Sequence, residues 1–406
     1  MKICGIIAEY NPFHNGHAYM MKTIREHCKD AVIVAIMSGS FTQRGEVGIL
    51  DKWNRAKTAV ENGCDVVFEL PFAYAVRSGE FFADGAVKIL SHLNIDYLAF
   101  GSETNNLDFL NNIAKITNNP DVQNKIHNAV ISGASYAQAL SAALSGDTDK
   151  NILLEPNDIL AVEYLKALRK YNSKIEPILI ERKAANHNDN EINANISSAS
   201  AIRGELKKHN PDFTLLKNNL PIQTFDKIQD RDKLYFHENI FKLLLAKLFT
   251  SNFCDLQNIY GINEGLEHRI LKAAKISQNY DELLQNISAK RYSKSRVSRA
   301  LTHILTGFTK DMAKEIDEYN SYARLLAFNY KGAKILRDIK FYSNIPIIEK
   351  TSRFIRENNI YQDYRELSPL QKSLALDIRA TNLQTLFCGS YDKINKDFLT
   401  SPIYIV

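Results

Sequence analysis

The feature that most constrains the fold is a short apolar segment near the start of the chain, followed at once by a polar loop. Residues 3–8 include three isoleucines and no charged residue, which is typical of a central, buried strand of a parallel sheet. Asn11 and Pro12 then predict a turn, because proline fixes its own φ angle and disfavours a helical conformation in the preceding residue. A helix is predicted from about His17 to His27. The order strand, tight loop, helix predicts an α/β fold.

The loop between this strand and helix has the composition of a phosphate site. Gly16 lets the backbone approach a ligand closely, and a helix that starts at the carboxyl edge of a strand presents unpaired N–H groups there. His14 and His17 add hydrogen-bond donors at the same place. The alternatives are a chance pair of surface histidines or half of a zinc site. Zinc needs further ligands, and the five cysteines form no C-x-x-C pair, so no protein metal site is predicted.

Apolar runs continue to alternate with helical patterns as far as residue 210. Strands are predicted at 31–37, 66–70, 97–100 and 175–180, and helices at 52–62, 79–91, 107–116, 122–131, 135–144 and 158–169. Asp51 is a favourable N-cap for one of these helices, and Gly63 is a usual residue to end it. The alternation predicts a parallel sheet that binds its ligand at the carboxyl ends of the strands.

Several polar positions follow these strands or open these helices. Gly101 comes after one strand, where it either admits a nucleoside or serves as a turn glycine. Arg182 comes after another strand, where a guanidinium can bind a phosphate in bidentate fashion. Asn157 opens a helix and is at least a capping residue. Residues 197–203 open a further helix with several serines, which either bind phosphate or only cap it.

After Pro211 the predicted elements are helical rather than extended. Helices are predicted at 238–248, 266–277, 280–285, 297–306, 309–319 and 369–378, and residues 401–406 are predicted to add a terminal strand or an apolar tail. The length and this change of pattern predict two domains, at 1–210 and 211–406.

One segment of the second half is strongly basic. From Leu283 to Lys310 there are six Lys or Arg and no Asp or Glu. Such a segment, with Tyr292 available for stacking, is suited to contact with a phosphate backbone, although a solvated basic helix has the same composition. Lys331, Lys334 and Arg337 are expected to extend it. The predicted RNA-binding residues are Lys290, Arg291, Lys294, Arg296 and Arg299.

Composition excludes some classes of protein. The net charge of +5 permits an anionic partner without requiring one. No run of 18 apolar residues is present, and Glu9 and Asn11 interrupt the first apolar segment too early for a signal peptide. The few scattered cysteines are typical of a reducing compartment, so a cytoplasmic protein without a membrane anchor is predicted.

The segment Asn11–His17 resembles the H-x-G-H signature of the nucleotidyltransferase superfamily, which is related to the class I aminoacyl-tRNA synthetases. A longer set of motifs resembles the tRNA(Met) cytidine acetate ligase family, and this similarity extends through most of the chain. The motifs are residues 5–20, 37–46, 51–56, 68–72 and 100–103.

The resemblance implies a fold, a reaction and its participants. The fold is α/β, with a Rossmann-like nucleotidyltransferase domain followed by a mainly α-helical C-terminal domain that binds tRNA. Acetate attacks the α-phosphate of ATP, with Mg²⁺ as a counter-charge, and forms acetyl-adenylate. The acetyl group then passes to N4 of the wobble cytidine of elongator tRNA(Met), which becomes N4-acetylcytidine. In the superfamily the two histidines steady the ATP phosphates, so His14 and His17 are the predicted catalytic residues.

The resemblance also implies the positions that bind ATP. The segment 197–203 matches a serine-rich phosphate-binding motif, except that Ala199 stands where a serine is common. The predicted ATP-binding residues are Ile7, Ala8, Glu9, Tyr10, Asn11, Pro12, Phe13, His14, Asn15, Gly16, His17, Ala18, Tyr19, Met20, Gly101, Asn157, Arg182, Ser198 and Ser200.

Two other functions fit parts of the sequence. An adenylyltransferase that joins AMP to a small phosphorylated metabolite needs the same H-x-G-H loop, but it does not need a long helical second half. A non-catalytic RNA-binding protein with a vestigial nucleotide fold would not need intact His14 and His17.

Overall fold

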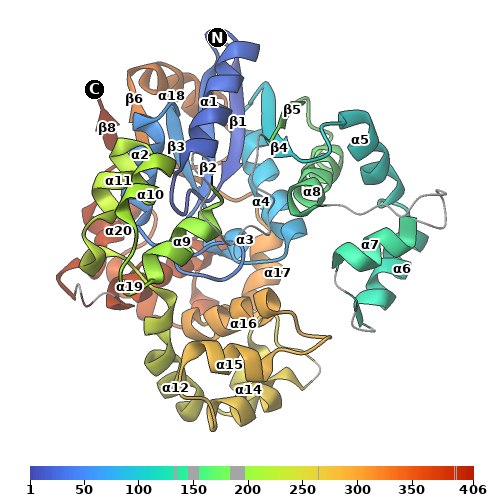
Figure 1. Cartoon of the computed structure of the whole chain (residues 1–406), viewed down its shortest axis with the longest axis vertical. Coiled ribbons are helices and arrows are strands. Elements are labelled where there is room, and N and C mark those ends of the chain that lie inside the picture. Colours follow the sequence, from blue (N-terminus) through green and yellow to red (C-terminus); the bar gives the residue numbers. More distant parts are fainter. Residues whose placement is uncertain are drawn as a thin grey trace.

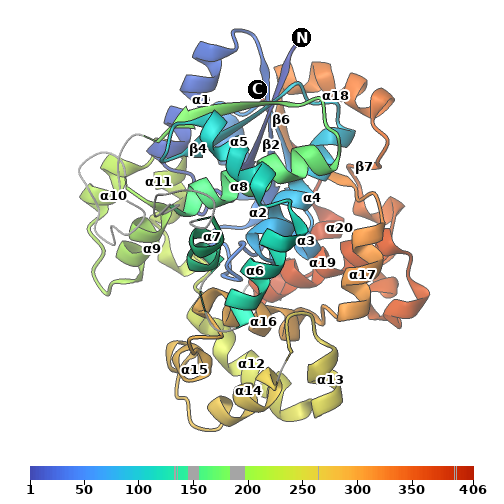
Figure 2. The ribbon, with the colours of Figure 1, turned by 90° about the vertical axis from the view of Figure 1, so that its right-hand side faces the viewer.

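The computed structural model describes residues 1–131, 134, 136–144, 155–182, 197–263, 265–387, 389 and 391–406. In this part of the chain, helices cover a central eight-stranded sheet, and a helical lobe extends beyond the ends of its strands (Figures 1 and 2). None of the described helices has the length and hydropathy that crossing a membrane would require.

The sheet has the order β5-β4-β1-β2-β3-β6-β7, and β8 also pairs with β6. Strands β1 to β5 are mutually parallel, which confirms the predicted parallel sheet, whereas β6 runs antiparallel to β3. Strands β2 and β3 lie on one side of β1, whereas β4 and β5 lie on its other side. The order of the strands therefore reverses at β1. The strands are β1 (Ile3–Ala8), β2 (Val32–Ser38), β3 (Val66–Leu70), β4 (Tyr97–Ser102), β5 (Glu176–Glu181), β6 (Ala323–Asn329), β7 (Ile347–Ile348) and β8 (Ile403–Ile405).

The helices predicted in the first half lie close to their predicted positions, and most differ by one to three residues at an end, whereas the short helix α3 was not predicted. They are α1 (Asn15–His27), α2 (Lys52–Glu61), α3 (Phe72–Ala75), α4 (Gly79–His92), α5 (Leu107–Ile116), α6 (Pro120–Ile131), α7 (Tyr136–Leu144), α8 (Pro156–Lys170) and α9 (Ala199–Lys207). Asp51 caps α2 as predicted, because its side chain accepts a hydrogen bond of 2.8 Å from the backbone N–H of Asn54.

The second half is mainly helical, as predicted. Its α-helices are α10 (Phe213–Asn219), α11 (Ile222–Ile228), α12 (Ile240–Thr250), α13 (Phe253–Asn258), α14 (Leu266–Ala274), α15 (Tyr280–Ile287), α16 (Lys294–Thr306), α17 (Lys310–Glu318), α18 (Tyr330–Tyr342), α19 (Pro369–Phe387) and α20 (Lys396–Leu399). Helices α12 to α16 form the lobe at one end of the molecule, while α18 lies at the opposite end (Figures 1 and 2).

The hydrophobic core lies on both faces of the sheet. Every residue of β2 is buried, as its unbroken apolar run predicts. Ile33 and Met37 face the core shared with α1 and α2, and Val34 and Ile36 face the core on the other side. The central strands are therefore held on both faces, and their carboxyl ends are fixed in position.

The expectation that strands are absent between Pro211 and the last few residues is wrong for β6 and β7. Strand β6 pairs with β3, and the predicted strand near the chain end, β8, pairs with β6. The strand was missed because Arg324 interrupts a short apolar run, and a charged residue is not expected in the interior of a sheet. Residues 323–405 thus add to the sheet that begins at Ile3, while the division at residue 210 stays a prediction.

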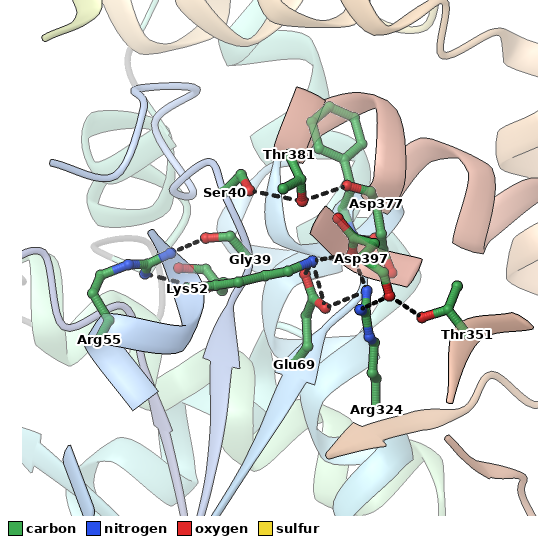
Figure 3. Close-up of polar contacts among 12 residues, drawn as sticks. Gly39, Ser40, Lys52, Arg55, Glu69, Arg324, Thr351, Asp377, Thr381 and Asp397 are labelled. Atoms are coloured by element: carbon green, nitrogen blue, oxygen red, sulfur yellow. Dashed lines mark hydrogen bonds and ion pairs between the residues drawn. The ribbon is translucent and has the colours of Figure 1, made fainter. Parts of the chain in front are cut away.

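Arg324 is accommodated by a buried ionic cluster, which we define as Lys52, Glu69, Arg324 and Asp397 (Figure 3). The ammonium of Lys52 lies 2.8 Å from Glu69 Oε1 and 2.7 Å from Asp397 Oδ1. Arg324 pairs with Asp397 and lies 3.4 Å from Glu69 Oε2. Two cations and two carboxylates from α2, β3, β6 and α20 therefore balance one another inside the protein.

Candidate functional site

The predicted histidine loop lies at the point where the order of the strands reverses. It follows β1, and the loop after the neighbouring strand β4 lies on its other side. In open α/β sheets, a reversal of this kind leaves a crevice outside the carboxyl ends of the strands, where ligands bind. The N-terminus of α1 points into this region with the positive end of its dipole.

The two histidines are fixed by the backbone of their own loop. His14 is the N-cap of α1, and its Nδ1 accepts a hydrogen bond of 3.1 Å from the backbone N–H of Gly16. His17 Nδ1 accepts one of 3.2 Å from the backbone N–H of His14. Because both Nδ1 atoms are acceptors, each neutral ring carries its proton on Nε2. The loop therefore supplies two Nε2–H donors on rings stacked with their centroids 3.7 Å apart.

The rings are also held in the uncharged form. Burial lowers the pKa of His14 to about 3, with further lowering by the charges of Arg182 and Arg203. Burial lowers the pKa of His17 well below its usual value, with the neighbouring ring and Arg182 as further causes. Both histidines thus act as neutral hydrogen-bond donors at physiological pH.

This arrangement predicts a loss of stability in acid. An unfolded histidine takes up a proton near pH 6.5, so below that pH the unfolded chain binds more protons than the folded one, and the folded state loses stability. With a folded-state pKa of about 3, His14 alone accounts for a loss of about 2 kcal/mol between pH 8 and pH 5. We expect the His14→Asn variant to lose less stability over this range in urea unfolding. An equal loss in both proteins would contradict this assignment.

The other residues of the loop fall into two groups. The side chains of Tyr10 and Phe13 are buried and pack against the ring of His17, with centroids 4.9 and 5.3 Å from it. Asn11 is buried as well, and its Oδ1 accepts a hydrogen bond of 2.8 Å from the backbone N–H of Ile49. These three buried side chains hold the histidine loop in place through packing and this hydrogen bond. Ile7, Ala8, Glu9, Asn15, Gly16, Ala18, Tyr19 and Met20 are partly exposed, and Pro12 is buried.

Helix α9 also contacts the histidine loop, through Arg203. The side chain of Ser198 caps this helix through a hydrogen bond of 3.1 Å from the backbone N–H of Ala201. Arg203 donates to the carbonyl oxygen of Asn11 at 2.8 Å and lies 3.1 Å from a carboxylate oxygen of Glu46. The serine-rich helix start and Arg203 are therefore brought next to the histidines, with Ser198 serving as a cap.

The structure also brings together Gly101, Asn157 and Arg182. The last residues of β4 and β5 pair with each other, and Arg182 follows directly. A side-chain Cβ at Gly101 would lie 3.1 Å from Cγ of Arg182, so the stem of this arginine passes over the glycine. Asn157, in the first turn of α8, donates a hydrogen bond to Glu103. The three predicted positions thus surround the loop that follows β4.

Two acidic residues that organise this loop were not predicted. Asp158 is buried, and its carboxylate accepts hydrogen bonds from Ser102 Oγ at 2.5 Å, from Thr104 Oγ1 at 2.5 Å and from the backbone N–H groups of Glu103 and Thr104 at 3.1 Å. Glu103 contacts both Asn157 and Arg182. A carboxylate directly after a predicted strand was the available signal for Glu103, whereas Asp158 was interpreted only as part of a helix start.

Arg55 is a third residue that the sequence did not reveal. Its guanidinium is buried and donates to the carbonyl oxygens of Leu50 at 3.1 Å, Glu9 at 2.6 Å and Ser38 at 3.1 Å, and also to that of Gly39 (Figure 3). Burial lowers its pKa to about 10, which still leaves it charged at neutral pH. Arg55 therefore fixes the carboxyl ends of β1 and β2. Its positive charge at these strand ends makes the binding of an anion there more favourable.

The polar loop 39–48 joins the site to the helical lobe. The backbone N–H of Gln43 donates to Glu9 at 2.6 Å, and Thr302 of α16 donates to the carbonyl oxygen of Gly45 at 2.8 Å. Gly45 has a φ of +77° and lies so close to α16 that a Cβ there would be 2.7 Å from the backbone nitrogen of Arg299. The loop 39–48 is thus the contact between the sheet and the helical lobe.

The predicted RNA-binding residues lie at the start of α16 and in the segment before it. Lys290, Arg291 and Lys294 are exposed, and Arg296 lies over the ring of Tyr292 at 5.0 Å. Arg299 is turned toward the site loop and donates to the carbonyl oxygen of Gln43 at 3.4 Å. Lys331, Lys334 and Arg337 belong to α18 at the other end of the molecule, so they do not extend this track (Figures 1 and 2).

In the part of the chain that the structure describes, no group of three or more His, Cys, Asp or Glu side chains could hold a metal ion.

Comparison with known proteins gives a consistent result over the whole chain. The model of a family described as HIGH Nucleotidyl Transferase matches residues 1–397. The tRNA(Met) cytidine acetate ligase of Thermoanaerobacter sp. strain X514 is 38% identical, with 98% of each chain covered, and that of Clostridium novyi is 37% identical, with 100% of each covered.

Solved structures agree with this result. The apo crystal structure of Thermotoga maritima TmcAL superposes with a TM-score of 0.89 at 30% identity, and both chains are fully covered. The structure of the same protein bound with alpha-thio ATP gives a TM-score of 0.88 at 31% identity over the same full coverage.

Proposed function

Since the chain belongs to the tRNA(Met) cytidine acetate ligase family, within the HIGH nucleotidyl transferases, we propose that it is an ATP-dependent acetate ligase. It activates acetate as acetyl-adenylate and transfers the acetyl group to N4 of the wobble cytidine of elongator tRNA(Met). The observation that carries this proposal is the pair of Nε2–H donors on His14 and His17 at the N-terminus of α1. A tRNA substrate implies that the enzyme acts in the cytoplasm.

The first step is attack of an acetate oxygen on the α-phosphorus of ATP. The bond from this phosphorus to the bridging oxygen breaks, and pyrophosphate leaves with that oxygen. Negative charge builds up on the phosphate oxygens, and preorganised donors aimed at such charge supply most of the catalysis in reactions of this kind. His14 and His17 are these donors here, through their Nε2–H groups at the positive end of the α1 dipole.

The second step uses no covalent bond to the protein. The N4 amine of the cytidine attacks the acetyl carbonyl carbon, AMP leaves with its phosphate oxygen, and N4 loses a proton. A wobble base lies in a loop, so less unstacking is needed to present it than for a base inside a duplex. The protein contributes mainly by holding the adenylate and the amine in reacting geometry.

Mg²⁺ is proposed to enter with ATP, bound mainly by its phosphates, as is common for this ion. In that role it neutralises charge on the triphosphate. The adenylyltransferase alternative is not favoured, because the full-length relatives are tRNA(Met) cytidine acetate ligases and α12 to α16 form an additional lobe.

The direct test is incubation of the protein with ATP, radiolabelled acetate and elongator tRNA(Met), followed by complete digestion of the RNA. Label is expected in N4-acetylcytidine and to depend on ATP. A tRNA whose wobble cytidine is replaced by uridine is the matched control and should stay unlabelled. Absence of label from the RNA, with active ATP–pyrophosphate exchange, would contradict the transfer step.

We also propose that Lys290, Arg291, Lys294 and Arg296 contact tRNA phosphates, with Arg299 assigned to the loop contact instead. Replacing Arg291, Lys294 and Arg296 together by alanine removes up to three such contacts. The slope of log Kd for tRNA against log salt concentration is then expected to fall by about 2 to 3. Fluorescence anisotropy with labelled tRNA measures it.

The control for this prediction is alanine at Lys331, Lys334 and Arg337, which removes the same charge from α18 at the far end of the molecule. This variant is expected to retain the salt dependence of the wild type. Equal changes in both variants would mean that net charge, rather than the start of α16, determines binding.

A further inference from the structure

The carboxylate of Glu103 has no role in the proposed chemistry, yet it is built into the nucleotide site. Its Oε1 accepts a hydrogen bond from the side-chain amide of Asn157 and lies 3.6 Å from Nε of Arg182. The side chain is 27% exposed, so it remains within reach of a ligand. Its two contacts are with residues expected to bind the nucleotide.

The position of Glu103 is fixed by the protein. The carboxylate of buried Asp158 accepts hydrogen bonds from the backbone N–H groups of Glu103 and Thr104 and from the hydroxyls of Ser102 and Thr104. Because Asn157 gives its Nδ2 to Glu103, its Oδ1 is directed away from that carboxylate. The loop after β4 is therefore preorganised before any ligand binds.

The order of groups along the site identifies what can face this carboxylate. The strand order β5-β4-β1 places Arg182, which directly follows β5, at the same carboxyl edge of the sheet as the histidine loop that follows β1. Its charge also lowers the pKa of both His14 and His17. Glu103 pairs with the same arginine and with Asn157 of α8. A nucleoside triphosphate with its phosphates at the histidines passes Arg182 and brings its ribose to Glu103 and Asn157.

An ionised carboxylate only accepts hydrogen bonds, and it repels phosphate. The ribose offers two adjacent hydroxyl donors, and an acidic residue that accepts from a ribose hydroxyl is a recurring device of nucleotide-binding α/β folds. We propose that Glu103 accepts hydrogen bonds from the ribose hydroxyls of ATP and makes the enzyme specific for ribonucleotides. The inference rests on the proposed use of ATP.

The test compares ATP with 2′-dATP and 3′-dATP in wild type and in Glu103→Gln. Binding is measured by calorimetry, and turnover by acetate-dependent ATP–pyrophosphate exchange. A hydrogen bond to a charged group corresponds to a preference of about 10- to 100-fold. The wild type is expected to prefer ATP over at least one deoxynucleotide by this factor. The variant should lose affinity for ATP, retain its affinity for that analogue, and so lose most of the preference.

The matched control is Glu181→Gln, which removes an exposed carboxylate from the end of the neighbouring strand β5. It is expected to leave the preference unchanged. Equal loss of affinity for all three nucleotides in Glu103→Gln, or no preference in the wild type, would overturn the proposal. The binding measurement contains no acetate or tRNA, so a ribose preference without acetate-dependent exchange would instead contradict the proposed function.

Discussion

Replacing His14 or His17 by alanine is expected to slow acetate-dependent ATP–pyrophosphate exchange by about 10²- to 10³-fold, the usual cost of removing one preorganised donor from a developing negative charge. Each histidine is fixed through Nδ1 and presents its proton on Nε2, so each substitution removes one such donor. The proposed binding of tRNA at the start of α16 should be unaffected. Steady-state exchange kinetics and tRNA anisotropy on the same preparation measure both effects.

A second substitution separates catalysis from folding at this position. His14 is also the N-cap of α1, and alanine at such a position costs about 1 kcal/mol of stability. Asparagine is a favoured N-cap that can accept the same backbone hydrogen bond, but it lacks the imidazole Nε2–H. His14→Asn should therefore be as slow as His14→Ala and more stable. Exchange within a few-fold of the wild-type rate in His14→Asn would refute a role for this donor.

The largest effect on stability is expected from the buried ionic cluster. Lys52→Met keeps most of the side-chain volume but leaves Glu69 and Asp397 with only Arg324 for charge balance. Breaking a buried pair by removing one partner costs about 3 to 5 kcal/mol, because an uncompensated charge stays in the interior. Urea unfolding should show this decrease in the free energy of unfolding, together with loss of activity, since Lys52 begins the helix that carries Arg55.

Lys57→Met provides the control on the same helix. Lys57 is partly exposed and lies 3.7 Å from Glu61, one helical turn away, a pair worth at most about 0.5 kcal/mol. The two variants remove the same charge from α2. If Lys52→Met changed stability by no more than Lys57→Met, the buried ionic cluster would not contribute to stability in the way proposed here.

The parts of the fold that the sequence predicted are those governed by local pattern. Strands β1 and β3 and the capped helix α2 follow from apolar runs and end residues, and the histidine loop follows from its position after β1. Strand β6 could not be predicted in this way, because Arg324 is tolerated only through Asp397 and Glu69. The burial of Lys52 depends on the same partners, which no local window contains.

The same distinction applies to the site. Gly101 and Arg182 were predicted to follow strands and Asn157 to open a helix, and the structure brings the three together. Which acidic side chain organises them depended on contacts between β4 and α8, so Glu103 and Asp158 went unassigned. Arg299 was grouped with the other arginines by charge alone, whereas packing of α16 against Gly45 turns it toward Gln43.

The distance along the chain between the members of the ionic cluster bears on how the protein matures during synthesis. Lys52 and its partner Asp397 are 345 residues apart. Domains generally fold as units, the N-terminal ones first, while the chain leaves the ribosome. Here the first strands and the histidine loop emerge early with Lys52 and Glu69, which pair with each other, whereas Asp397, the carboxylate that balances the charge of Arg324, is translated near the end. A nascent chain that ends between Arg324 and Asp397 therefore holds the histidine loop on a sheet that lacks β8, and the two cations Lys52 and Arg324 then face the single carboxylate of Glu69.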